Sequence, residues 1–181
     1  MEQRLPFVKE MKKQLPDAIL VKGGVYENRY TDNHNTYRRA LKASGGLPTI
    51  MMQDDLILCE GFREKAINEI AQRPGDVIQF FSMRGADLTV GSRYEAGGKF
   101  NCNPCVYFPE KMTADLYSYF VENEKRFPYD KYGTDCVVRE YLKERKLKYF
   151  IVIPNLVDHA VAVSMIDKRR SSKRQSKTFQ K

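Results

Sequence analysis

Long apolar runs and cysteines are both scarce in this sequence of 181 residues. No stretch approaches the ~20 consecutive apolar residues that cross a bilayer, and the start, Met1-Glu-Gln-Arg-Leu-Pro6, lacks the basic and then apolar layout of a secretory signal. The four cysteines are too few and too scattered for a disulfide framework. We therefore expect a soluble, cytoplasmic protein that does not bind membranes.

A complete zinc motif is also missing. Cys102 and Cys105 have the spacing of zinc ligands, but no second cysteine pair or histidine pair completes a set of four ligands. The residues that follow, Val106-Tyr-Phe108, continue as a strand, whereas a thioredoxin-type pair would open a helix. Thiols in and around a core strand are the favoured interpretation, and a zinc site is the alternative.

Acidic residues are absent from the C-terminal end of the chain. The formal net charge is +8, and seven basic residues from position 168 onward carry most of it: Lys168, Arg169, Arg170, Lys173, Arg174, Lys177 and Lys181. We expect a catalytic domain over residues 1–166 and a basic C-terminal tail or lid over residues 167–181. Such a tail favours polyanions, whether nucleic acid, acidic lipid or a ligand diphosphate, and the alternative is a solvated terminus.

Apolar periodicity predicts an α/β fold in one compact domain. Helices and strands largely alternate, which is typical of a mixed, mainly parallel sheet with helices on both faces. Residues 84–99 are too polar and interrupted for the core. The expected helices cover residues 6–15, 36–44, 61–72, 109–122 and 134–145, and the expected strands cover residues 18–21, 47–52, 77–82, 103–108 and 147–153.

Two adjacent carboxylates end the apolar run of residues 47–52. Asp54 and Asp55 follow this run after Gln53, so they are expected where a buried parallel strand opens onto a crevice. Carboxylates in such a place suit a divalent metal ion. The alternative is a turn or a helix cap after a strand.

Four motifs, one of which contains this acidic pair, are spread along the sequence. They are Tyr37-Arg-Arg-Ala-Leu-Lys-Ala43, Thr49-Ile-Met-Met-Gln-Asp-Asp-Leu-Ile-Leu-Cys-Glu-Gly-Phe62, Gly133-Thr-Asp135, and Pro154-Asn-Leu-Val-Asp-His159 followed by Ser164. In this order and spacing, the sequence resembles the small GT-A-type glycosyltransferases of phages and bacteria. The resemblance implies a GT-A-like (Rossmann-type) fold, a nucleotide-sugar donor, most plausibly a uridine diphosphate sugar, and a Mn²⁺ or Mg²⁺ cofactor. For a phage protein, the location is the host cytoplasm.

The resemblance also implies roles for individual residues. It assigns Asp55 and His159 to the metal and Asp135 to catalysis, as a base or an acceptor-binding acid. Gln53 replaces the first acid of the family's motif, so the resemblance does not imply binding of the metal by both ends of the motif. The residues assigned to the nucleotide sugar are Arg38, Arg39, Gln53, Asp54, Lys168, Arg169 and Arg170.

Each assignment has a structural alternative. His159 beside an acid after a strand is often a satisfied structural residue, and Thr134 or Asp135 is a plausible helix N-cap. Arg38 and Arg39 point about 100° apart on a helix, so at most one of them is expected to serve the site directly. His34, the other histidine, has no assignment.

Three functions follow from these features. The first is a metal-dependent glycosyltransferase, either inverting or retaining, for which a hydroxymethylated base of phage DNA is a candidate acceptor. The second is a non-catalytic nucleic-acid-binding α/β module with a basic arm. The third is a degenerate transferase fold kept for interaction, which the departure at Gln53 favours.

Overall fold

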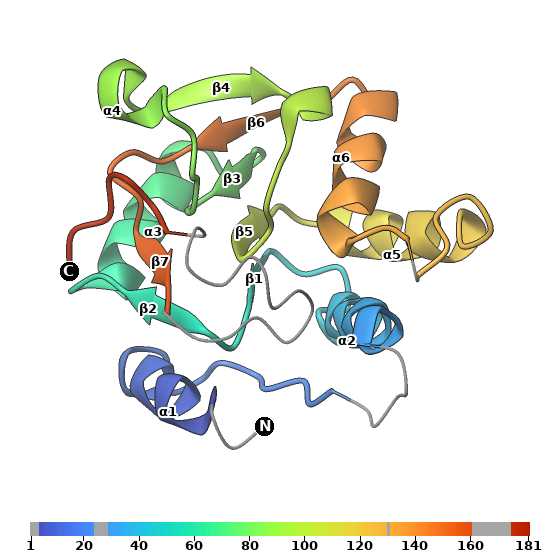
Figure 1. Cartoon of the computed structure of the whole chain (residues 1–181), viewed down its shortest axis with the longest axis horizontal. Coiled ribbons are helices and arrows are strands. Elements are labelled where there is room, and N and C mark those ends of the chain that lie inside the picture. The colour runs from blue at the N-terminus through green and yellow to red at the C-terminus, as the bar shows by residue number, and fades with distance from the viewer. Residues whose placement is uncertain (1–3, 24–28, 130, 161–174) are drawn as a thin grey trace.

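Five strands form the central sheet of the computed structural model, which describes residues 4–23, 29–129, 131–160 and 175–181 (Figure 1). Their order is β1-β5-β3-β6-β4, and of the described neighbours only β3 and β6 run parallel. The expected α/β class and mixed sheet are confirmed, but the expectation of a mainly parallel sheet is wrong. The strands are β1 (Thr49–Met52), β3 (Val77–Gln79), β4 (Arg93–Ala96), β5 (Cys105–Phe108) and β6 (Lys148–Ile151).

Strand β5 shows why an apolar run does not predict strand direction. All four of its residues are buried, although β5 is antiparallel to both of its neighbours. A continuous apolar run indicates that both faces of a strand are buried. Because helices cover both faces of this antiparallel sheet, the run does not distinguish parallel from antiparallel pairing. β1 also differs from expectation, because it lies at the edge of the described sheet and buries only Met51.

Helices cover the two faces of this sheet. Side chains of β5 alternate between two apolar clusters, Val106 and Phe108 in one and Cys105 and Tyr107 in the other. The first cluster lies under α2, α5 and α6, and the second lies under α3 (Figure 1). The helices are α1 (Leu5–Gln14), α2 (Arg29–Ala43), α3 (Phe62–Gln72), α4 (Asp87–Val90), α5 (Met112–Glu122), α6 (Thr134–Glu144) and the 3₁₀ turn η2 (Gly97–Lys99).

A second, two-stranded sheet was not predicted. It pairs β2 (Leu56–Leu58) with β7 (Val157–His159) in antiparallel orientation, with Leu56 opposite His159. The backbone N–H of Ala160 extends this pairing by donating to the carbonyl oxygen of Asp55 at 2.9 Å. The small sheet therefore brings the end of β7 to the residues that follow β1.

Three other segments differ from the expected elements. Residues 18–21 form no strand, and Ile19 is 79% exposed, because this apolar stretch finds no described neighbouring strand to pair with. Residues 84–99 contain α4 and β4, whose charged side chains pair with one another, as Arg93 does with Asp87 and Glu95. α2 begins at Arg29, earlier than the expected start at residue 36.

The length and the apolar character of a helix decide whether it can cross a membrane. None of the helices in the described ranges combines the length and the apolar character required to cross a bilayer.

Gly97 allows η2 to approach α6 closely. A Cβ at this position would lie 2.6 Å from the Cβ of Leu142 and 2.7 Å from its carbonyl carbon. Gly97→Ala is therefore expected to lower the free energy of unfolding by about 1–3 kcal/mol, as overpacking usually does. Urea denaturation would measure the change. Gly98→Ala is the matched control, since its nearest contact would be an ordinary 3.5 Å to Lys143, and equal effects of the two variants would contradict this account.

Candidate functional site

The acidic pair lies in the short connection between β1 and β2. Because β2 belongs to the second sheet, the chain changes sheets at Asp54 and Asp55. The two side chains differ in exposure, at 42% for Asp54 and 14% for Asp55. Asp55 is therefore held largely inside the molecule, and Asp54 faces the solvent more.

His159 lies beside Asp55. Its Nδ1 is 3.6 Å from Asp55 Oδ1, a consequence of the register that sets Leu56 opposite His159. The imidazole side chain is 9% exposed, and its ring meets the ring of Phe81 edge-on at 5.1 Å. Asp55 Oδ1 is buried and has no hydrogen-bond partner. The structure thus brings together the two residues assigned to a metal ion, with one carboxylate oxygen left unsatisfied.

Arg4 is a third member of this site. Its guanidinium forms ion pairs with both acids, through Nη1 to Asp54 Oδ1 and through Nη2 to Asp55 Oδ2 at 3.2 Å. Burial of Asp55 by itself raises the pKa of this carboxyl group, but His159 and Arg4 outweigh burial and hold the pKa below its usual value. Ionisation of Asp55 is therefore favoured, and an ionised carboxylate is the form that can bind a cation.

The donor set is small for a metal centre. Within the described ranges, no group of three or more His, Cys, Asp or Glu side chains is arranged to hold a metal ion. A carboxylate oxygen and a ring nitrogen of His159 do face each other, and both atom types bind Mn²⁺ and related ions. The acids fit a divalent cation best when the Arg4 guanidinium does not already occupy them.

Two hydrogen bonds connect the end of β1 with the start of α6, where Asp135 lies. The backbone N–H of Gln53 donates to the carbonyl oxygen of Pro104 at 2.8 Å, and the next residue back, Asn103, donates from its side chain to the Thr134 hydroxyl at 3.1 Å. Asp135 follows Thr134 in the first turn of α6 and is half-buried. The N-cap position itself is Gly133, so neither Thr134 nor Asp135 is the cap.

The two candidate arginines lie on α2 and contact other groups. Arg38 donates to the Tyr129 hydroxyl and pairs with Glu124 at 3.5 Å. Arg39 bonds within its own helix, to the Asn35 carbonyl oxygen and the Thr36 hydroxyl. None of these contacts involves Asp54 or Asp55, and a role of either arginine in nucleotide binding stays a prediction.

Sequence reasoning gave no role to His34, which is 1% exposed. Its Nε2 donates to the Tyr132 carbonyl oxygen at 2.6 Å, and its ring stacks on Tyr129 at 4.6 Å. Nδ1 is buried without a hydrogen-bond partner. Burial lowers the pKa of His34, which favours the neutral imidazole. A histidine in a polar stretch gives no sequence signal of such burial, because α2 hides it against the loop that follows α5.

Of the basic tail, the structure describes residues 175–181. Lys168, Arg169 and Arg170, together with Ser164, lie outside the described residues. Further on, the backbone N–H of Ser176 donates to Asp158 Oδ1 at 2.7 Å, and its hydroxyl donates to Asn155 Oδ1 at 2.7 Å. Phe179 packs against the second apolar cluster. The last residues of the chain are therefore attached to the strand that carries His159.

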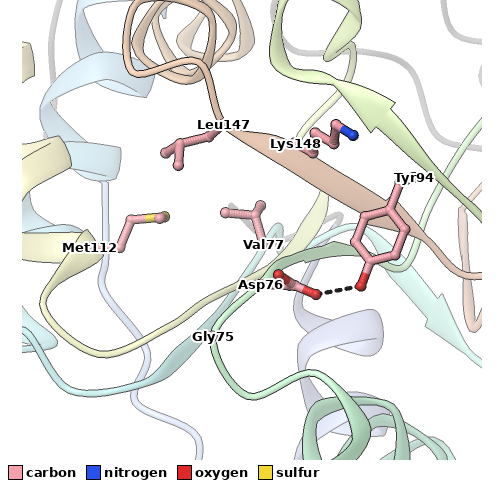
Figure 2. A pocket seen from close by; sticks show the side chains of 7 residues that line it. All are labelled: Gly75, Asp76, Val77, Tyr94, Met112, Leu147 and Lys148. Atoms are coloured by element: carbon pink, nitrogen blue, oxygen red, sulfur yellow. Dashed lines mark hydrogen bonds between the residues drawn. The ribbon is translucent and has the colours of Figure 1, made fainter.

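Two surface hollows lie away from these residues. One, of about 340 Å³, is lined by residues at the starts of β3 and β6, and Figure 2 shows the Tyr94 hydroxyl donating to Asp76 on its rim. The other, of about 550 Å³, lies between α4 and residues 177–180. Neither contains any of the residues assigned to a ligand or to catalysis.

Comparison of the chain with protein-family models, curated proteins and solved structures found no match.

Proposed function

We propose that this protein is a metal-dependent glycosyltransferase of the GT-A type, which uses a uridine diphosphate sugar as donor. The observation that carries the proposal is the approach of Asp55 and His159 to 3.6 Å from distant parts of the sequence. The resemblance in sequence assigns these two residues to one metal ion, and Asp55 Oδ1 is a buried oxygen without a hydrogen-bond partner that can accept one.

Asp55 and His159 would hold the ion, with Asp54 beside them. Mn²⁺ or Mg²⁺ bound there would neutralise charge that develops on the departing nucleoside diphosphate. The largely buried setting of Asp55 strengthens its electrostatic interactions relative to water.

Asp135 is proposed to bind the acceptor. Its carboxylate lies in the first turn of α6, where a negative charge interacts favourably with the helix dipole. A carboxylate at this position can accept a hydrogen bond from an acceptor hydroxyl and take its proton. We propose a hydroxymethylated DNA base as this acceptor, since the basic residues at positions 168–170 and beyond favour a polyanion.

Thermal denaturation with nucleoside diphosphates tests the proposal. Uridine diphosphate with Mn²⁺, at about 100 times its dissociation constant, should stabilise the protein by roughly 2.7 kcal/mol. For a chain of this size, such a gain raises the melting temperature by about 5–10 °C. Each compound alone should give a much smaller rise. If no nucleoside diphosphate changes the melting temperature with either metal, the proposal fails.

A nucleic-acid-binding module is the second candidate, and the excess of basic residues near the C-terminus favours it. A module of this kind would bind DNA with an affinity that falls steeply with salt. Its binding would survive both metal chelation and the substitution Asp55→Asn. A transferase, in contrast, needs Asp55 and a divalent ion for donor binding.

A further inference from the structure

His34 joins α2 to the connection between α5 and α6, which the structure describes at residues 123–129 and 131–133. Its Nε2 donates to the Tyr132 carbonyl oxygen at 2.6 Å, and its ring stacks on the Tyr129 ring at a centroid distance of 4.6 Å. At 1% exposure, the imidazole lies entirely inside the molecule. His34 is therefore an internal contact between two segments 98 positions apart in the sequence.

Charged groups from α2, α6 and the α5–α6 connection act on His34. Arg38, one turn further along α2, donates to the Tyr129 hydroxyl and pairs with Glu124 at 3.5 Å. Burial, the largest influence, and Arg38 lower the pKa of His34, whereas the hydrogen bond of its Nε2, Asp135 and Glu124 raise this pKa. The pKa is lowered overall, so the neutral imidazole is the favoured form in the closed structure.

We propose that His34 is a pH-sensitive latch, which holds the α5–α6 connection to α2 when its imidazole is neutral and releases the connection when the imidazole is protonated. In the neutral form Nε2 carries the proton that it donates to Tyr132, and Nδ1 is buried without a hydrogen-bond partner. A second proton, on Nδ1, would create a buried charge with an unsatisfied N–H group, which is costly.

Release of the connection does not require α6 to unfold. Tyr132 is 40% exposed, so this end of the connection lies at the surface. Thr134, which opens α6, is held separately, because the Asn103 side chain donates to its hydroxyl at 3.1 Å. The charged ring can therefore reach water through a local opening. The latch does not depend on the proposed function.

The direction of the pH effect follows from proton uptake. In the open state His34 is solvated and has an ordinary pKa of about 6.5, whereas its pKa is lowered in the closed state. The open state therefore binds more protons as the pH falls through 6.5, and the closed state loses stability relative to it. For a closed state that stays neutral, the equilibrium constant for opening should rise about threefold between pH 7.0 and pH 6.0.

Hydrogen exchange measured by NMR over about the same interval, from pH 7.0 to pH 6.0, tests the latch. The N–H groups of Lys131 and Tyr132 donate to the Pro128 carbonyl oxygen at 3.0 and 3.2 Å, so they report opening of the connection. After correction for intrinsic rates, their exchange should become about threefold faster at the lower pH. The Asp76 N–H, which donates to the Arg73 carbonyl oxygen at 3.1 Å in the turn after α3, is the control and should not change.

His34→Gln is the matched variant, because glutamine can donate to the Tyr132 carbonyl oxygen and does not titrate. It should keep the connection closed and remove the pH dependence of exchange. An equal change in His34→Gln and in the unaltered chain would overturn the proposal. The imidazole signals give a second measurement, which needs only the unaltered chain with its two histidines. The signal of His34, identified by the edge-on contact of its ring with Phe120, should titrate below the ordinary pKa, and titration at the ordinary pKa would overturn the latch as well.

Discussion

Asp55→Asn is expected to abolish the Mn²⁺-dependent thermal shift with uridine diphosphate. Asparagine keeps the size of the side chain but removes the charge of the more buried acid, which is the one that faces His159. Loss of an anionic oxygen ligand should weaken metal-dependent nucleotide binding by about 100-fold or more, because hard cations depend on ligand charge. At a fixed nucleotide concentration, a rise of about 5–10 °C would fall to about 1 °C or less.

The control for this variant is an acid of the same type outside the site. Asp17 has an 83% exposed side chain and a long contact of 3.5 Å to Arg63, so Asp17→Asn removes one charge without touching the site. It should retain the full thermal shift. A shift that survives in Asp55→Asn would remove Asp55 from the metal site and favour the nucleic-acid-binding alternative.

Local patterns in the sequence predicted most helices but not the direction of the strands. The helices over residues 61–72 and 134–145 were predicted within about two residues of their ends, because apolar periodicity and breakers act locally. Strand direction depends on which segments of the chain pair with each other. An apolar run such as Val106-Tyr-Phe108 indicates that a strand is buried but not which strands it pairs with. The strand expected at residues 18–21 failed for the same reason, since apolar residues form no strand without a partner.

Two residues of the candidate site, Asp55 and His159, could be predicted from the sequence. Asp55 and His159 could be placed together through a resemblance in motif order, and the structure brings them within 3.6 Å. Arg4 could not be predicted, because its contact with Asp54 depends on how α1 packs after the chain folds. The β2–β7 pairing that sets this geometry was also missed, since three-residue strands leave almost no periodic signal.

Asn155→Ala is expected to have the largest effect on stability among the variants considered. The Asn155 side chain is almost fully buried, at 1% exposure, and it joins three segments that meet before β7. It accepts a hydrogen bond from the Ser82 N–H at 3.0 Å and donates to the Val152 carbonyl oxygen at 2.8 Å. It also accepts a hydrogen bond from the Ser176 hydroxyl at 2.7 Å.

Alanine at position 155 would leave two backbone groups unsatisfied in the interior. Each buried donor or acceptor without a partner costs about 1–3 kcal/mol, so the free energy of unfolding should fall by roughly 2–5 kcal/mol. Urea denaturation followed by circular dichroism suits the measurement, because the sequence has no tryptophan for fluorescence. The midpoint should fall with an unchanged slope.

Asn123→Ala supplies the matched comparison. Asn123 is half-buried and donates one hydrogen bond, to the Tyr119 carbonyl oxygen of its own helix, so its loss should cost about 1 kcal/mol or less. If the two variants unfold alike, Asn155 does not hold its three segments together. A larger loss for Asn155→Ala would identify this residue as a support of the segment that leads into β7, which carries His159 opposite Leu56 and beside Asp55.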